Sequence, residues 1–349
     1  MASLDKIEFL LEQYEPQVRS EFMDAIRDVT SNTILVDVIR RLEAGDLEGA
    51  IASIDAPPAV FNPLVTLAVA SIFAAAGSAV VQSLPRVVTS DGVRLVPRFD
   101  NRTRRATTYQ EQRSTDLTSR LSDEIATVAR QTFSEGVPEG RSADKLVLDV
   151  VGRISRQRNK REGGMIGLTP QLATWVRSAR KELSGNTDGY SAYLNRRLRD
   201  ARFDGIVNRA ATAGEPLDAK RVDAIVGRYA DTLLKFRASV LSHAETLESS
   251  HAGQVEGMQQ LVESGSVPPD SVRKTWRISG LPNTRDSHQD LNGTTVYMNE
   301  PFRARGGNLM YPGDRSLGAD ASEIINCRCH AVYGLSYKTT QGQRRQKIG

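Results

Sequence analysis

The fold of the last third of the chain is decided by a stretch that begins Thr275-Trp276-Arg277-Ile278 and ends Asn326-Cys327-Arg328-Cys329-His330. This stretch holds both cysteines of the 349-residue chain and two of its four histidines. Between its ends, turn residues such as Gly306-Gly307 and Pro312-Gly313-Asp314 separate short runs of β-prone residues, for example 294–297. The pattern predicts a small, loop-rich α+β domain over 238–337.

The same stretch contains the ligand types that zinc prefers, which are thiolates and an imidazole. A small domain with long loops has little core of its own, so an ion that ties its start to its end would stabilise it. One hypothesis is therefore a metal site, with zinc as the candidate ion, formed by His288, Cys327 and Cys329. The candidates for the fourth ligand are His330, His251 and a carboxylate.

The alternative interpretation is that Cys327 and Cys329 are small buried side chains and that His288 forms an ordinary hydrogen bond. A Cys-x-Cys motif without a second Cys-x-x-Cys motif is weaker than a full zinc-finger signature. On spacing alone, the packing interpretation is favoured.

Six elements follow one another through this region: Trp276, Thr284-Arg285-Asp286-Ser287-His288, Leu291-Asn292-Gly293, Pro301-Phe302, Pro312-Gly313-Asp314 and Asn326-Cys327-Arg328-Cys329. Their order and spacing resemble the C-terminal signature of the phage Mu F-like minor head proteins. The preceding segment, with Ala244-Glu245-Thr246 and 261–265, is similar to the helix that leads into that signature. The sequence departs from the family at Leu281-Pro282-Asn283, where the family often has an acidic residue.

The resemblance implies a structural virion protein of a tailed phage or prophage, present in several copies. Its expected place is the capsid interior or the portal vertex, close to the packaged genome, after assembly in the host cytoplasm. The portal protein and the major capsid protein are the expected protein partners, with a role in head assembly or genome delivery. The resemblance also implies zinc binding by His288, Cys327 and Cys329, and it implies no catalytic activity.

An enzymatic alternative is a metal-dependent nuclease or hydrolase that uses His288 with Asp286 or Asp290. Such chemistry needs a metal with an open coordination position and a general base nearby. The His-x-Asp motif is too short to establish either, and two cysteines are more typical of a closed structural site.

The N-terminal segment 1–97 is predicted to be helical and acidic, with 7 Lys and Arg against 13 Asp and Glu. Apolar residues recur at helical spacing over about 1–55, with turns at Gly45-Asp46 and Pro57-Pro58. A short β-hairpin is predicted around Asp91-Gly92. The acidic charge favours a protein partner over nucleic acid, so we predict a docking domain. Its first residues lack the basic-then-apolar order of a signal peptide.

The uncharged run 60–84 approaches the length of a membrane span. It is rich in Ala, Ser, Thr and Gly, which let helices approach closely, so we predict a buried central helix. The alternative is a helix that enters the host envelope if the protein is ejected with DNA and forms a conduit.

The middle segment 98–237 is basic, with 27 Lys and Arg against 18 Asp and Glu. Helices are predicted from about 115, 142 and 169, and a long one from 217 to about 265. The tail 338–349 is polar and basic. Clustered arginines favour sequence-independent contacts with double-stranded genomic DNA, although interspersed acids are also typical of a solvated surface. The candidates are Arg102, Arg104, Arg105, Arg156, Arg158, Arg196, Arg197 and Arg199.

Overall fold

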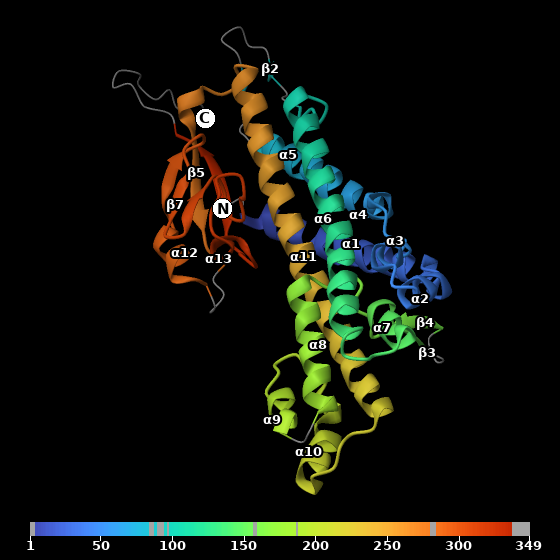
Figure 1. The fold of residues 1–349 in the computed structure, drawn as a ribbon. Helices are drawn as coiled ribbons and strands as arrows, with labels where there is room; N and C mark the ends of the chain where they lie inside the picture. Colours follow the sequence, from blue (N-terminus) through green and yellow to red (C-terminus); the bar gives the residue numbers. More distant parts are fainter. Residues whose placement is uncertain are drawn as a thin grey trace. The chain divides into compact units, whose positions relative to one another are not determined.

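The computed structural model describes residues 4–83, 87–88, 94–95, 98–155, 159–185, 188–279 and 284–336. In this part of the chain the fold is mainly helical, with a three-stranded sheet near the C-terminus (Figure 1). The predicted class, mainly α with a small α+β C-terminal region, is confirmed. Two compact units are present. Unit 1 comprises Met1–Val18, Thr66–Arg113 and Ser242–Gly349, and unit 2 comprises Arg19–Val65 and Ser114–Leu241.

The division into units differs from the contiguous segments expected from composition. The expected boundary at residue 97 falls inside unit 1, whereas that at 237 lies close to Ser242, where the last segment of unit 1 begins. Three long helices, α1 (Leu4–Asn32), α6 (Arg104–Gly136) and α11 (Ala219–Glu263), each contribute residues to both units. A long apolar stripe can serve two cores along its length, so a change in charge composition need not mark a boundary.

Unit 2 is a helical unit, and two of its α-helices begin with a side-chain cap. Asp46 accepts a hydrogen bond from the Gly49 N–H at 2.9 Å, and Thr169 accepts one from the Leu172 N–H at 3.3 Å. The elements are α2 (Leu35–Glu43), α3 (Leu47–Ala52), η1 (Pro58–Phe61), α4 (Asn62–Val65), α7 (Ala143–Val151), α8 (Pro170–Ser184), α9 (Asp188–Leu194), η3 (Ala201–Phe203) and α10 (Asp204–Ala213).

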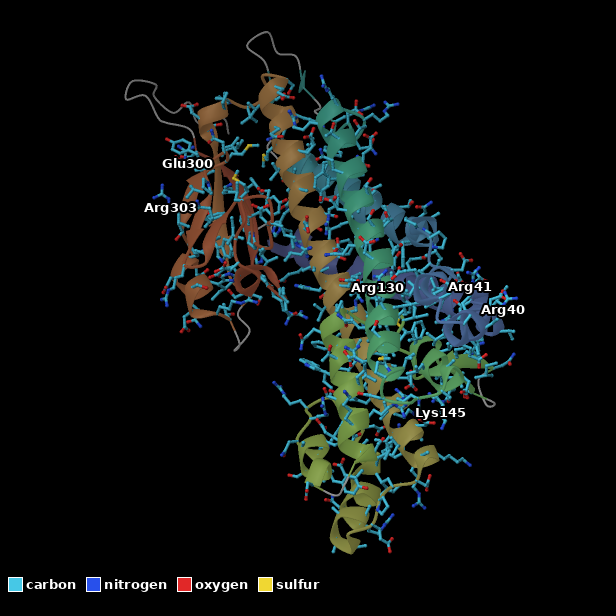
Figure 2. The ribbon with its side chains drawn as sticks, in the orientation of Figure 1. Arg40, Arg41, Arg130, Lys145, Glu300 and Arg303 are labelled. Atoms are coloured by element: carbon cyan, nitrogen blue, oxygen red, sulfur yellow. The ribbon has the colours of Figure 1, made fainter. Side chains whose placement is uncertain are left out.

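Buried apolar side chains and a few polar bridges hold unit 2 together. On α1, Phe22, Ile26 and Val29 are at most 4% exposed, as their helical spacing predicts. Arg130 of α6, labelled in Figure 2, donates to Glu48 of α3 at 2.7 Å. A hairpin of β3 (Arg153–Ser155) and β4 (Lys160–Glu162) forms where the sequence shows only a basic cluster.

The apolar run predicted as one helix over 60–84 is helical over its described residues, 60–83, but it is not uniform, and it belongs to unit 1 from Thr66 onward. A π-helical segment, η2 (Thr66–Ser71), precedes α5 (Ile72–Ser83). The stretch Pro58–Ser83 is long and apolar enough to cross a membrane, and 56% of its most apolar window is buried within the structure. Phe73 of α5 stacks on Tyr109 of α6 with ring centroids 5.1 Å apart. The prediction of a buried helix is therefore confirmed for α5.

Glycines in α11 allow α5 to approach the backbone of that helix closely. A Cβ atom at Gly253 would lie 2.2 Å from the Phe73 carbonyl oxygen, and one at Gly257 would lie 2.9 Å from that of Gly77. Only residues without a side chain fit at such distances. The Gly-x-x-x-Gly spacing thus fixes where the two helices cross.

The C-terminal part of unit 1 is built on a sheet with strand order β6-β5-β9. The central strand β5 (Val272–Arg277) pairs antiparallel with β6 (Thr295–Tyr297) and with β9 (His330–Leu335). One face of β5, with Val272, Lys274 and Trp276, is fully buried. Figure 1 shows the sheet beside the C-terminal half of α11. The remaining elements are η4 (Pro269–Ser271), α12 (Asp286–Leu291), α13 (Ala321–Ile324) and the hairpin β7 (Phe302–Ala304) with β8 (Gly307–Leu309).

Some predicted features lie at or beyond the limits of the described residues. The predicted hairpin is present as β1 (Val87–Val88) paired with β2 (Arg94–Leu95), but its turn at Asp91-Gly92 lies outside the described residues. The basic tail 338–349 lies outside them as well. The long helix predicted over 217–265 is confirmed as α11.

Candidate metal centre

Three of the four predicted metal ligands converge in unit 1. His288 lies on the short helix α12, and Cys327 and Cys329 lie just before β9. Their relative exposures are 1%, 2% and 3%. Their candidate ligand atoms all lie within 4.8 Å of one another. Residues about 40 positions apart therefore form one buried cluster with the chemistry of a metal site.

The imidazole is oriented so that one ring nitrogen faces both sulfur atoms. His288 Nδ1 lies 3.5 Å from Cys327 Sγ and 3.5 Å from Cys329 Sγ. Contact between the sulfurs lowers the pKa of Cys327 and raises that of Cys329, so one thiol of the pair loses its proton more readily than an isolated buried thiol. A thiolate and an imidazole nitrogen are thus presented to the same point, as metal binding requires.

The other ring nitrogen of His288 faces a carboxylate that sequence reasoning did not identify. His288 Nε2 lies 2.9 Å from Glu323 Oε2, on α13. Glu323 also accepts hydrogen bonds from Ser287 Oγ at 2.9 Å and from the Gly306 N–H at 3.0 Å. Burial by itself raises the pKa of Glu323, but these donors and the charge of His288 hold it below its usual value. A carboxylate behind a ligating histidine fixes the ring and its tautomer.

The predicted fourth ligand His330 does not join the cluster. Adjacent residues of an extended chain point to opposite faces, so His330 and Cys329 diverge where β9 begins. Burial, with a smaller effect of Arg277, lowers the pKa of His330 to about 4. His251 is also engaged elsewhere, because its Nε2 accepts a hydrogen bond from the Ala331 N–H at 3.1 Å. Within the described residues, the site therefore has three protein ligands.

Local backbone geometry and a second histidine hold the cysteine segment in place. Asn326 has a φ of 56°, a left-handed conformation that asparagine tolerates better than most residues. His243 of α11 hydrogen-bonds the Cys327 carbonyl oxygen through Nε2 at 2.6 Å, and its Nδ1 contacts Glu15 of α1. These contacts tie the cysteine turn to the helices of unit 1.

Aromatic rings enclose the centre on the side of the sheet. Trp276 packs edge-on against His288 with centroids 5.0 Å apart, and against Phe302 with centroids 5.2 Å apart. Both aromatic residues are fully buried, and they form one core cluster with the two cysteines. Such a shell excludes water from the ligand atoms.

Two buried glutamates on α11 near the centre are paired with an arginine of unit 1. Glu245, singled out by the family resemblance, forms an ion pair with Arg113 of α6 and is 1% exposed. Glu248 lies 3.0 Å from the same guanidinium. Removing one member of such a pair leaves an uncompensated buried charge, so the pair specifies how α6 packs on α11.

Acid should destabilise unit 1 through His251. Burial, with a smaller effect of His330, lowers the pKa of His251 to about 3, although a hydrogen bond to the Pro312 backbone acts in the opposite direction. The value expected in the unfolded chain is about 6.5. The contribution of neutral His251 to the free energy of unfolding is complete above pH 6.5. It declines as the pH falls, because the imidazole takes up a proton only in the unfolded state. Between pH 6.5 and pH 5 the free energy of unfolding should fall by about 2 kcal/mol.

The measurement is the denaturant-derived free energy of unfolding against pH for the native sequence and for His251→Gln, whose amide oxygen can still accept the Ala331 N–H. The variant should show a shallower decline. The same pH dependence of the unfolding free energy in both proteins would show that His251 is not the group responsible.

The predicted DNA-contact arginines are largely paired with carboxylates. Arg105 pairs with Glu256 at 2.5 Å and with Glu263 at 2.6 Å. Arg104 and Arg197 are exposed and have no ion pair among the described residues, whereas Arg156 and Arg158 lie outside them. The other ion pairs are Arg102–Asp100, Arg196–Glu182 and Arg199–Asp204. Pairing leaves less free positive charge for phosphates than composition indicates.

Comparison with known proteins gives two partial matches. No protein-family model and no solved structure matches the chain. The uncharacterized protein YqbB of Bacillus subtilis (strain 168) is 34% identical over 97 residues, which cover 27% of this chain and 29% of that protein. The NAD(+)–arginine ADP-ribosyltransferase EFV of Enterococcus faecalis (strain ATCC 700802 / V583) is 37% identical over 62 residues, 18% of this chain and 12% of that protein. The chain thus matches less than a third of either relative.

Proposed function

We propose that the chain is a structural minor head protein of a tailed phage whose C-terminal region is held closed by a zinc ion. The protein acts at the portal vertex or inner capsid, close to packaged DNA. The observation that carries this proposal is the convergence of His288, Cys327 and Cys329. They are the residues through which the sequence resembles the Mu F-like proteins, and they lie together in one buried cluster.

The spacing of the donor atoms supports zinc as the ion. With Zn–S of about 2.3 Å and Zn–N of about 2.0 Å, a tetrahedral angle places sulfur and nitrogen about 3.5 Å apart. Both Sγ–Nδ1 separations at His288 are 3.5 Å. Bound there, zinc would supply a cross-link between α12 and the segment before β9. Glu323 would hold the imidazole with Nδ1 toward the ion.

Burial favours a structural role over the alternative of a metal-dependent nuclease. The three ligands are at most 3% exposed, so a substrate does not reach them. Asp286 is exposed, and Asp290 pairs with Arg305 at the surface, 2.6 Å away. Neither Asp286 nor Asp290 belongs to the cluster, so neither is placed as the general base that the nuclease alternative requires.

Glu323→Gln should weaken zinc binding without abolishing it. The amide keeps the size of the side chain but loses the charge that orients His288, so we expect a loss of affinity of about 10- to 100-fold. The measurement is competition for zinc with a chromogenic chelator. Glu300→Gln, at an exposed glutamate of the same unit, is the control. An unchanged affinity in Glu323→Gln would show that the carboxylate has no such role.

The virion role is tested in the phage or prophage that encodes the chain. We expect mass spectrometry of purified DNA-filled particles to detect the protein, and we expect deletion of its gene to reduce the yield of infectious particles. A protein absent from particles, with normal particle yield after deletion, would contradict the proposal. Cleavage of DNA by the purified chain, lost in His288→Ala, would favour the nuclease instead.

The ejection alternative is tested with lipid. A helix that forms a conduit should insert into vesicles of bacterial phospholipid and release a trapped dye. A protein that leaves such vesicles intact would act in head assembly alone, with α5 remaining in its buried position.

A further inference from the structure

Unit 2 contains a cavity of about 460 Å³ that the proposed virion role does not use. It lies between α6, α7, α8 and α11, and all of its lining residues belong to unit 2. Met165, Val176 and Val226 form an apolar part of its wall and are each at most 4% exposed. A cavity of this volume, with an apolar wall and a few converging polar groups, is typical of small-molecule sites.

Beside the cavity, three arginines share two aspartates. Asp149 accepts hydrogen bonds from Arg141 at 2.5 Å, from Arg180 at 2.8 Å and from Arg153 at 3.1 Å. Asp223 accepts one from Arg180 at 2.6 Å and lies 3.2 Å from Arg153. All four carboxylate oxygens therefore face guanidinium groups, and one positive charge remains without a counterion in this cluster.

Two further cationic groups at the cavity have unused donors. Arg177 is 10% exposed, and its Nε and Nη2 bind Glu135, but its Nη1 has no hydrogen-bond partner among the described residues. Lys145 of α7, labelled in Figure 2, is exposed and has no ion pair in the described part of the chain. Arg177 Nη1 has less than 1 Å² of accessible surface, so a ligand in the cavity does not reach it, and Lys145 is the lining cation that offers free charge.

The charges around the cavity leave a surplus of two. The lining contributes five cations and four carboxylates, and Arg153 adds a sixth cation through its bonds to the two aspartates. The cations are Arg141, Lys145, Arg177, Arg180, Lys181 and Arg153, and the carboxylates are Glu135, Glu139, Asp149 and Asp223. A phosphate monoester carries up to two negative charges near neutral pH, which matches this surplus.

We propose that this cavity binds a small phosphate ester of about the size of a nucleoside monophosphate. The phosphate oxygens accept hydrogen bonds from Arg141 and Lys145, which both line the cavity, and the rest of the ligand packs on Met165 and Val176. Double-stranded DNA is too wide to enter a pocket of this volume, so the ligand is a free small molecule. This site is independent of the metal centre, which lies in unit 1.

The test is calorimetric titration of the full chain with adenosine monophosphate, with inorganic phosphate as competitor. One site per chain and displacement by phosphate are expected. Lys145→Gln should weaken binding about tenfold, the effect of losing one charged hydrogen bond. Lys235→Gln, at an exposed lysine of unit 2 away from the cavity, should bind as the native sequence does.

Several outcomes would overturn the proposal. One is the absence of binding by adenosine monophosphate and inorganic phosphate up to about 10 mM, the range of weak ligands. A second is equal binding of adenosine, which would show that the phosphate is not recognised. A third is equal affinity in Lys145→Gln and Lys235→Gln. Binding of duplex DNA alone, weakened by Lys145→Gln, would assign the cluster to the genome rather than to a small molecule.

Discussion

Cys327→Ser and His288→Ala are each expected to abolish the binding of about one zinc ion per chain and to unfold the C-terminal part of unit 1. A structural zinc ion contributes on the order of 10 kcal/mol to the folding of a small metal-dependent domain. The sheet of unit 1 is small, with strands of three to six residues, and its core around Trp276 includes both sulfur atoms. Loss of the ion should therefore lower the free energy of unfolding by at least about 4 kcal/mol.

The measurements are metal content by mass spectrometry and thermal unfolding followed by tryptophan fluorescence. Trp276 lies 5.0 Å from the His288 ring, so its emission reports on the centre. His330→Gln is the matched control, because His330 is buried in the same region but lies outside the cluster. We expect this variant to retain the metal.

Two results would contradict the zinc proposal. The native protein could contain no metal and melt at the same temperature with and without a chelator. Alternatively, His330→Gln could lose the metal as completely as His288→Ala does. In the first case Cys327 and Cys329 are packing residues, and in the second the ligand set is different from the observed cluster.

The cluster of His288, Cys327 and Cys329 could be predicted from the sequence through the family resemblance, whereas spacing alone favoured packing. Glu323 could not, since nothing in its spacing distinguishes it from the other acidic residues until α13 places it beside His288. His330 was included because it is adjacent to Cys329. The structure places His330 outside the cluster, because side chains of adjacent residues in an extended chain point in opposite directions and β9 begins at His330.

Helix positions were largely predictable because apolar spacing and caps are local signals. The stripe that predicts α11 and the cap at Thr169 depend on residues a few positions apart. The two units depend instead on contacts between distant segments, such as Arg105 with Glu256, 151 residues later. Charge composition cannot show that such an arginine is paired, because the carboxylate that neutralises it lies on another helix. The same reason explains why the basic middle segment has less free charge than expected.

Gly253→Val is expected to separate α5 from α11 and to destabilise unit 1 by about 3 kcal/mol or more. A Cβ atom at this position would lie 2.2 Å from the Phe73 carbonyl oxygen and 3.1 Å from the Gly77 nitrogen. Both neighbours are backbone atoms, so they cannot move aside as a side chain could. The gain in helix propensity from replacing glycine is below about 1 kcal/mol and does not offset this clash.

The control is Gly205→Ala on α10, where a Cβ atom would meet nothing within 4 Å, so its stability should be unchanged or slightly higher. Denaturant unfolding of both variants provides the comparison, and equal stabilities would show that α5 does not pack on α11 as closely as the glycines of α11 indicate.

Gly253→Val also addresses the ejection alternative, because it weakens the contact that keeps α5 buried. If α5 inserts into membranes on release from α11, Gly253→Val should increase dye release from phospholipid vesicles. If its apolar surface serves only as core, the variant should unfold or aggregate and leave the vesicles intact.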